Sequence, residues 1–345
     1  MFPARSTRAA LAGAVALVML ASACSEDPTQ PSPGPSGPSG PDAVTYLTGF
    51  NASAHDAFIF VADEKGFFED AGIDIDIQLG AGTQNLPALL SDEAQFTYID
   101  LVGLLYAMGN GDTEPGSFRV LNTVHQSTLA AIMAPESGDI TSPQDLTGKK
   151  IGAFVGSPTQ FLLPVYAEMA GWEYDAANVV AVTPQELFGL IPGGRADALS
   201  TFIIQKGVVE QAAQGPMRVF PMNEVLSDML GTGLISSSAL ADSNPDLVTR
   251  FRDAALEGLQ YTLDNPEEAI QILSDRNPGA VPVLPAFVAQ IRMMTPYITG
   301  EGADQIGTLD ESHVMRCISV LESAGLIPAG LAPDAIMGEQ TLQAS

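Results

Sequence analysis

The sequence predicts an α/β fold with two lobes, in which short strands alternate with amphipathic helices. From Val44 onward, short apolar runs alternate with amphipathic stretches, which is typical of α/β units around a largely parallel sheet. The alternation occurs twice, first up to Ala134 and again from Lys150. With 345 residues, 46% of them hydrophobic, the chain is long and apolar enough to form two such lobes.

The charge balance excludes some functions. The chain has 41 acidic residues against 14 basic ones, a formal net charge of −27. Nucleic-acid binding and polybasic membrane anchoring both depend on clustered Lys and Arg. We therefore expect neither.

Residues 1–23 have the pattern of a secretory signal peptide. Arg5 and Arg8 precede a 13-residue apolar run, Ala9 to Ala21, which is too short to span a bilayer. Small residues then lead into Cys24, which resembles the bacterial lipobox, whose Cys carries the lipid. That pattern prefers Leu three places before the Cys, and Leu20 is four before. The alternative is an ordinary cleavage site followed by an incidental Cys.

Residues 24–43 are predicted to be a linker. Ser25 to Asp42 holds six Pro and three Gly in 18 residues and has no large apolar side chain. A lipid on Cys24 would place the folded part outside the cell, anchored to the outer face of the membrane.

The first round of α/β units is expected to give alternating strands and helices. The strands are expected at 44–49, 73–79, 94–98, 118–124 and 129–134, and the helices at 57–70, 86–90 and 101–108. Gly66 and Gly72 are expected at helix ends.

The second round is expected to repeat this pattern. Its strands are predicted at 150–154, 179–182, 196–201, 218–220 and around 234–235, with helices at 157–169, 185–191 and from 204. In the helical C-terminal third, Asn244 and Pro245 start one helix, and Asn265 and Pro266 start another. Cys317 shares an apolar helix face and is predicted to be buried.

Four motifs occur in the order and spacing of a known family. They are FVADEKGFFEDAGIDI at 60–75, SGDITSPQDLTGKKIG at 137–152, GGRADA at 193–198, and GTGLI at 231–235 followed by Asn-Pro at 244–245 and NPEEA at 265–269. Together they resemble the NMT1/THI5-like and SsuA-like substrate-binding proteins of ABC importers. The resemblance spans almost all of residues 44–342.

The resemblance implies a type II periplasmic-binding-protein fold. Two α/β lobes, joined by two crossing strands, would close by hinge motion over a ligand. We expect residues 44–134 with 236–345 to form the first lobe and 135–235 the second. The implied partners are an ABC permease and its ATPase, and we expect a monomer.

The ligand site is predicted at the carboxyl ends of the strands, where open α/β sheets bind ligands. The loops there are 50–55, 80–83, 98–100, 125–127, 156–159 and 201–202. The candidate ligand-binding residues are Asn51, His55, Asp56, Gly82, Thr83, Tyr98, Asp100, Gln126, Ser157, Thr159, Thr201 and Phe202.

The family implies either a heteroaromatic ligand, such as a thiamine-pyrimidine precursor or a riboflavin-like compound, or an anion such as an alkanesulfonate, taurine or nitrate. None of the Lys or Arg residues lies in the six loops, whereas Phe50, Tyr98 and Phe202 do. A neutral flat ring that stacks on aromatic side chains fits this composition better. An anion would depend on the backbone N–H groups after Ser157, and Pro158 removes one of them.

The histidines differ in their predicted roles. In some thiamine-pyrimidine binders a His precedes the first helix, and an ungapped alignment on Gly66 places that position at Asp56, with His55 one residue earlier. Either residue is therefore a candidate. His125 ends a strand and is another candidate, while His313 is expected at the surface.

The rival classes are an enzyme and a ligand sensor on the same fold. A fungal branch of the family makes the thiamine pyrimidine, but its Cys-rich iron motif has no counterpart here. Three dispersed His do not form a metal site, and residues 155–158 lack the nucleophile-elbow pattern. We expect a binding protein without metal, cofactor or catalytic residue.

Overall fold

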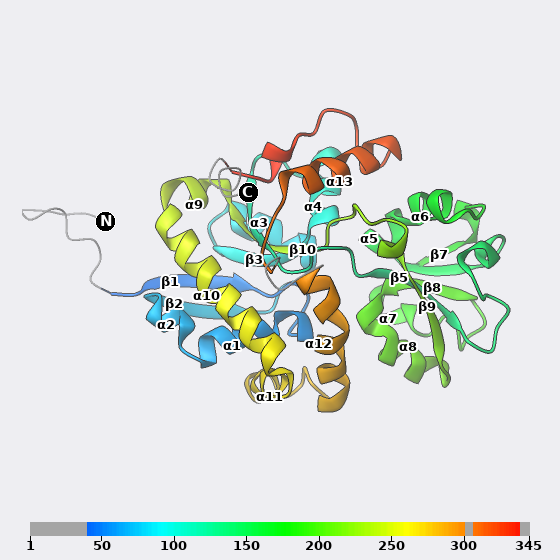
Figure 1. Cartoon of the computed structure of the whole chain (residues 1–345), viewed down its shortest axis with the longest axis horizontal. Helices are drawn as coiled ribbons and strands as arrows, with labels where there is room; N and C mark the ends of the chain where they lie inside the picture. Colours follow the sequence, from blue (N-terminus) through cyan, green and yellow to red (C-terminus); the bar gives the residue numbers. More distant parts are fainter. Residues whose placement is uncertain (1–39, 301–305, 339–345) are drawn as a thin grey trace, which may run out of the picture. The chain divides into compact units, whose positions relative to one another are not determined.

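Within residues 40–300 and 306–338, which the computed structural model describes, ten strands form two five-stranded sheets (Figure 1). The predicted signal peptide, Cys24 and most of the predicted linker lie outside the described residues. The first sheet has the order β2-β1-β3-β10-β4, and the second has the order β7-β6-β8-β5-β9. The fold is thus the predicted two-lobed α/β type.

The strands agree closely with the predicted ones. The first sheet consists of β1 (Asp42–Leu47), β2 (Ile73–Gln78), β3 (Phe96–Asp100), β4 (Phe118–Thr123) and β10 (Thr232–Ser237). The second consists of β5 (Ala130–Pro135), β6 (Ile151–Phe154), β7 (Val179–Val182), β8 (Ala198–Phe202) and β9 (Met217–Pro221). β1 pairs in parallel with β2 and β3, as β6 does with β7 and β8.

Two connections join the sheets, and they lie earlier along the chain than the predicted boundaries at 134 and 235. β5 belongs to the second sheet, where it pairs antiparallel with β8 and β9. β10 returns to the first sheet and pairs antiparallel with β3 and β4. The chain therefore changes sheets at 124–129 and at 222–231. An apolar run predicts a strand, but the partner strands decide to which sheet it belongs.

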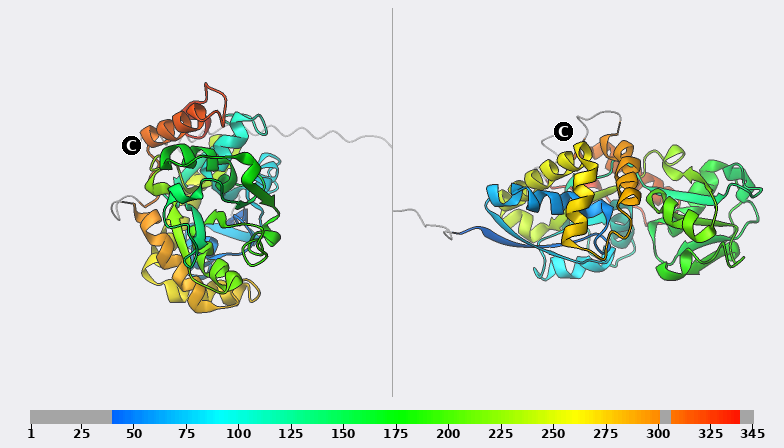
Figure 2. Two further views of the ribbon diagram at one scale, coloured as in Figure 1. Left: turned by 90° about the vertical axis from the view of Figure 1, so that its right-hand side faces the viewer. Right: turned by 90° about the horizontal axis from the view of Figure 1, so that it is seen from below.

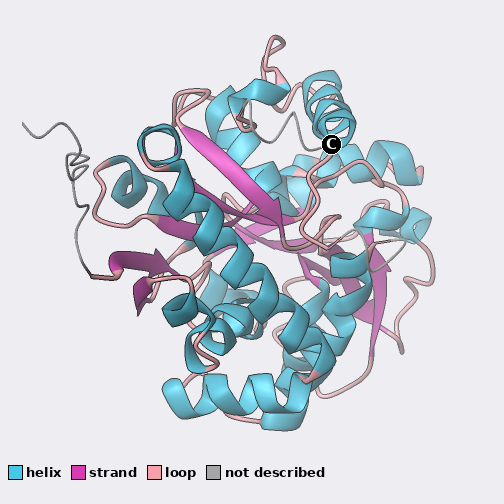
Figure 3. Ribbon diagram, turned by 60° about the vertical axis from the view of Figure 1, so that its left-hand side comes forward, coloured by secondary structure: helices cyan, strands magenta, loops and turns pink. Residues whose placement is uncertain are grey.

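Helices cover both faces of the strands (Figure 3). Those that accompany the first sheet are α1 (Ala57–Glu64), α2 (Phe67–Asp70), α3 (Leu86–Leu90), α4 (Leu101–Gly109), α9 (Ser238–Ser243), α10 (Pro245–Asp264), α11 (Pro266–Arg276), α12 (Leu284–Thr299) and α13 (Glu311–Ser323). Those of the second are α5 (Pro158–Phe161), α6 (Leu163–Ala170), α7 (Pro184–Leu187) and α8 (Lys206–Ala213).

Two predicted helices are each divided into two. The helix expected at 57–70 is interrupted at Gly66, whose φ of 80° is a left-handed conformation that glycine adopts without strain. The helix expected at 157–169 restarts at Leu163, because Pro164 cannot donate a backbone hydrogen bond inside a continuous helix. Asn244 caps α10 as predicted, accepting from the Leu247 N–H at 3.2 Å.

The hydrophobic core connects the lobes as well as filling them. One buried cluster contains Leu104 and Ile235 of the first lobe together with Ile132 and Ala153 of the second. A second cluster packs the first sheet against α1, α10, α11 and α12, and in it the rings of Phe96 and Phe251 stack at 3.8 Å. Cys317 is fully buried on α13, as predicted.

Helix α12 was not predicted, and it lies beside both lobes (Figure 1, Figure 2). It contacts the short 3-10 helices η1 (Ala54–Asp56) and η5 (Ile203–Gln205), which follow β1 and β8. α12 therefore borders the carboxyl ends of strands from both sheets. Within residues 40–300 and 306–338, no helix has the length and apolarity that crossing a membrane requires.

Candidate functional site

Three rings from separate segments meet near the carboxyl edge of the first sheet. Tyr98 lies within β3, two residues before its end, His125 follows β4, and His55 lies in η1 after β1. The His55 ring stacks on Tyr98 with centroids 6.2 Å apart, and it meets the His125 ring edge-on at 6.1 Å. We call these three residues the ring cluster.

Hydrogen bonds hold one side of the ring cluster. The Tyr98 hydroxyl lies 3.1 Å from Nδ1 of His125, and the Thr232 hydroxyl lies 2.6 Å from the same nitrogen. Tyr98 and His125 are buried, while His55 is half-buried. Thr232 comes from β10, so the returning strand helps to position His125.

Asp56 stabilises the loop rather than facing an open site. Its carboxylate accepts hydrogen bonds from the Tyr46 hydroxyl at 3.0 Å, the Gly49 N–H at 2.9 Å and the Ser53 hydroxyl at 3.2 Å. The side chain is completely buried. Of the two alternatives that the alignment left open, His55 is the one in the ring cluster.

Burial changes the protonation of the groups around the ring cluster. Desolvation raises the pKa of Asp56 to about 7, although its three hydrogen bonds act in the opposite direction. Desolvation also lowers the pKa of His55 to about 4 and that of His125 well below its ordinary value. Both imidazoles are therefore neutral at pH 7.

A hollow lies against the ring cluster and has almost entirely apolar walls. It has room for about one water-sized group and is lined by Ala54, His55, Phe58, Val124, His125, Leu259, Thr262, Leu263, Ile291, Met294 and Ile298. Nε2 of His125 is buried, and no hydrogen-bond partner for it exists in the described part of the chain. We call this hollow the His125 chamber.

The corresponding edge of the second sheet has its polar atoms already engaged. The Ser157 hydroxyl donates to the Phe154 carbonyl at 2.7 Å and accepts from the Gln160 N–H at 3.2 Å. It also lies 2.8 Å from the buried hydroxyl of Thr159. The Gly156 N–H donates to the Gln160 side chain at 2.7 Å.

Candidates from both lobes come together at the start of α4. Asp100 caps this helix by accepting from the Gly103 N–H at 2.8 Å, and burial raises the pKa of its carboxyl to about 7. A Cβ on Gly103 would lie 3.5 Å from Pro158 and 3.7 Å from Thr83. The structure therefore brings loops 80–83, 98–100 and 156–159 together.

The remaining candidates are more dispersed. Asn51 is exposed with a φ of 52°, and the Gly82 N–H donates to the Gly49 carbonyl at 2.5 Å. The Gln126 N–H donates to the Tyr297 carbonyl of α12 at 2.7 Å. Thr201 is buried on β8, and the half-buried Phe202 packs against the cluster that contains α12.

Sequence reasoning missed Thr232 and the α12 wall of the chamber. The GTGLI motif included Thr232, but nothing in the motif indicated that its hydroxyl meets His125. For α12, the apolar spacing of Val288, Ile291, Met294 and Ile298 was a usable signal. His313, expected at the surface, is half-buried, and its Nε2 is buried.

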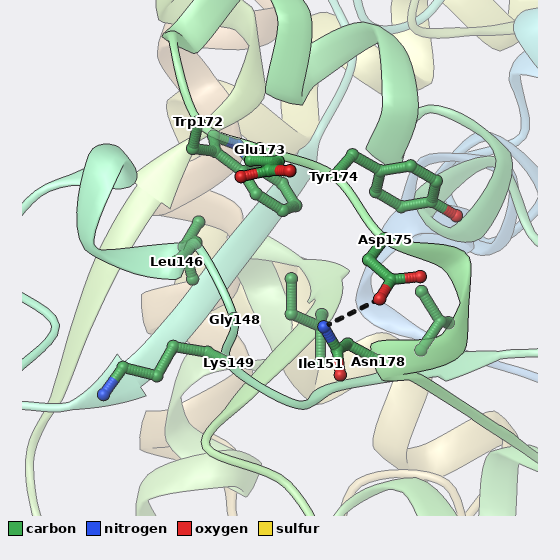
Figure 4. A pocket seen from close by; sticks show the side chains of 10 residues that line it. Leu146, Gly148, Lys149, Ile151, Trp172, Glu173, Tyr174, Asp175 and Asn178 are labelled. Atoms are coloured by element: carbon green, nitrogen blue, oxygen red, sulfur yellow. Dashed lines mark hydrogen bonds between the residues drawn. The ribbon is translucent and has the colours of Figure 1, made fainter.

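A second, narrow hollow lies in the second lobe and is distinct from this site (Figure 4). Trp172, Tyr174 and Lys149 line it, together with Ile151 and Val179. Ile151 and Val179 begin β6 and β7, so this hollow is at the opposite edge of the sheet from Ser157. No group of three or more His, Cys, Asp or Glu that would hold a metal occurs in residues 40–300 and 306–338.

Two α/β lobes joined by two crossing connections, with rings and polar groups at the carboxyl ends of their strands, define a protein of the periplasmic-binding-protein class. The chain belongs to the NMT1/THI5-like family, whose model matches residues 53–269. This family was the one that the four sequence motifs indicated.

Two curated relatives are binding proteins. The chain is 27% identical to a formylaminopyrimidine-binding protein of Halalkalibacterium halodurans over 240 residues, which are 67% of this chain and 70% of that protein. It is 28% identical to a riboflavin-binding protein of Chloroflexus aurantiacus over 157 residues, 45% of this chain and 44% of that protein.

Solved structures share the fold at low sequence identity. The aliphatic sulphonate binding protein SsuA of Escherichia coli superposes with a TM-score of 0.69 at 17% identity, covering 85% of this chain and 96% of that one. The desulfurization enzyme DSZB superposes with a TM-score of 0.55 at 19% identity, covering 88% of this chain and 99% of that one. These likenesses concern the fold alone.

Proposed function

We propose that this protein is the extracytoplasmic binding component of an ABC importer and captures a small, uncharged heteroaromatic compound. The compound would resemble formylaminopyrimidine or riboflavin, the ligands in the names of two relatives. Closure of the two lobes about the connections at 124–129 and 222–231 would enclose it. The family supports a solute-binding role with a transporter as partner.

The observation that carries the proposal is the ring cluster at the carboxyl edge of the first sheet. Tyr98, His55 and His125 place neutral aromatic rings where this fold class binds ligands, and the half-buried His55 is the most accessible of the three. Aromatic faces bind flat rings by stacking, and a few polar atoms then fix the orientation of the ligand.

The structure offers little to a sulfonate or nitrate. No Lys or Arg lies in the six loops, and both helix starts there are already capped. Asp100 accepts from the first turn of α4, and Ser157 from the first turn of α5. An anion at either start would compete with these caps and lie close to the Asp100 carboxyl.

An enzymatic role has less support. One similar fold is that of an enzyme, but the relatives described above are binding proteins. Cys317, the one cysteine within residues 40–300 and 306–338, is buried, and desolvation raises the pKa of its thiol to about 12. Such a thiol is a poor nucleophile.

A ligand panel tests the proposal directly. Isothermal titration and thermal melting with formylaminopyrimidine, riboflavin, an alkanesulfonate and nitrate should show binding and a raised melting temperature for a ring compound. Stabilisation by the anions alone would exclude the heteroaromatic ligand.

The membrane anchor is tested separately. Cys24→Ala should move the protein from the membrane fraction to the released fraction, because the proposed lipid would have no attachment site. Cys317→Ala is the matched control and should leave the fractionation unchanged. Unchanged fractionation of Cys24→Ala would show that Cys24 is not the anchor.

A further inference from the structure

The His125 chamber contains one polar atom that the fold leaves unused. His125 is fully buried, and its Nδ1 is engaged by Tyr98 and Thr232, but its buried Nε2 has no partner in the described part of the chain. Buried polar atoms are nearly always hydrogen-bonded, to protein, water or a ligand. An unpartnered one at the wall of a hollow therefore needs an explanation.

The other walls of the chamber are apolar. Besides the two histidines, Thr262 is the one polar residue that lines it, and its hydroxyl already donates to the Gly258 carbonyl at 2.8 Å. No charged side chain lines it. A group that enters would find hydrocarbon on most sides and the buried, unpartnered Nε2 of His125.

We propose that the His125 chamber is a specificity subsite, which receives one short uncharged substituent of the ligand ring and pairs its polar atom with His125 Nε2. This inference rests on the proposed function, because it assumes that the ring itself stacks at the ring cluster. The class of substituent is a single small hydrogen-bonding group, such as a hydroxyl or a ring amino group, because the chamber has room for about one water-sized group. A charged substituent would lose its hydration without gaining a partner charge.

Helix α12 makes this subsite selective for size. Ile291, Met294 and Ile298 form one wall, and all three are buried. The same helix accepts a hydrogen bond from the Gln126 N–H in the connection between the sheets, and it contacts η5 of the second lobe. A substituent too long for the chamber would clash with α12, which both lobes contact, and would therefore bind less well.

Nitrogen NMR of the imidazoles tests the inference, because the chain has three histidines and their signals are separable. With ¹⁵N-histidine protein, binding of formylaminopyrimidine or riboflavin should shift the Nε2 resonance of His125. The signal of His313, on α13 and outside the site, is the internal control and should stay in place.

A filling variant gives a second readout. Met294→Phe should weaken binding of the same compound by roughly tenfold or more, because pocket size discriminates at the level of single carbon groups. Met294→Leu, which nearly conserves volume, is the matched control and should bind almost as well as wild type. Thermal melting of both variants checks that they fold.

The outcomes separate the two proposals. Tight binding of a ring compound with an unmoved His125 Nε2 and full affinity in Met294→Phe would overturn the subsite and leave the proposed function intact. The chamber would then be a structural cavity that holds water. Binding of a sulfonate or nitrate without any ring compound would overturn both.

Discussion

The carboxyl edges of the two sheets are built differently. At the second sheet, Ser157 and Thr159 are bonded to each other, Ser157 also donates to the Phe154 carbonyl, and the Gly156 N–H donates to the Gln160 side chain. At the first sheet, rings cluster beside a hollow, and Nε2 of His125 has no partner in the described residues. An edge whose polar groups are already hydrogen-bonded within the protein is suited to covering a ligand. An edge with an unpaired polar atom is suited to recognising one.

The two lobes also differ in the chemistry of their carboxyl groups. Near the first edge, burial raises the pKa values of Asp56 and Asp100 to about 7. In the second lobe, hydrogen bonds from Thr141 and Ser142 lower the pKa of Asp145 to about 2. In the first lobe, the carboxyls of Asp56 and Asp100 are buried, which lowers the stability of the native state at pH values where they would ionise. In the second lobe, the carboxylate of Asp145 accepts hydrogen bonds that stabilise a turn. Active and binding sites commonly show such perturbed groups.

The largest expected effect is that of Tyr98→Ala. Tyr98 is 5% exposed and packs against Phe58 and His55, so its removal leaves a cavity. We expect the free energy of unfolding to fall by about 3–5 kcal/mol, together with loss of ring binding. Urea denaturation and titration measure the two effects. Loss of both stability and binding would show that Tyr98 serves the core as well as recognition.

Two companion variants sharpen the comparison. Tyr98→Phe keeps the ring but removes the hydroxyl beside His125, and it should lose about 1 kcal/mol. Thr159→Val at the second edge removes a hydroxyl that bonds within its own lobe, and it should leave ring binding nearly unchanged. Wild-type stability in Tyr98→Ala would contradict the buried ring cluster.

The sequence predicted the strands better than their connections. Alternating apolar residues placed β2, and the caps at Asn244 and Pro245 placed α10, because these signals are local. Membership of β5 and β10 in a sheet depends on antiparallel partners that are 66 to 140 residues away, which no local pattern specifies. α12 shows that a local signal can also be overlooked.

The meeting of the loops was predicted better than the contacts between their side chains. Strand ends converge in this fold class, so loops 50–55, 98–100 and 125–127 were expected to meet. Whether His55 or Asp56 faced the rings depended on hydrogen bonds to Tyr46 and Gly49, which lie outside the motif. The sequence alone therefore does not predict which of the two residues faces the rings.

The next largest effect is a dependence on pH in Asp56→Asn. The native protein holds a proton on Asp56 at pH values where the unfolded chain has lost it, so the free energy of unfolding falls as pH rises from about 4 to about 7, because proton release favours the unfolded chain. Asparagine cannot ionise. Between pH 5 and pH 8 the variant should therefore gain roughly 2 kcal/mol relative to wild type, measured by urea denaturation at each pH.

Asp145→Asn is the control of opposite sign. Its lowered pKa means that its stabilising contribution is present throughout pH 5–8 and is lost only as pH falls towards about 2. The difference from wild type should be constant across the same window. A constant difference for Asp56→Asn as well would show that its carboxyl is not desolvated.

The smallest effect is expected for Ser157→Ala, which tests whether the second edge only closes over the ligand. The Ser157 hydroxyl caps α5 by accepting from the Gln160 N–H at 3.2 Å, so its loss should cost about 1 kcal/mol. Ser237→Ala is a matched control, because Ser237 accepts from the Leu240 N–H at the same 3.2 Å at the start of α9, next to the opposite edge of the first sheet. If ring compounds bind both variants equally well, Ser157 is a structural cap. A roughly tenfold loss of affinity in Ser157→Ala alone would correspond to about 1.4 kcal/mol. That result would mean that both edges contact the ligand, and it would contradict the proposed difference between them.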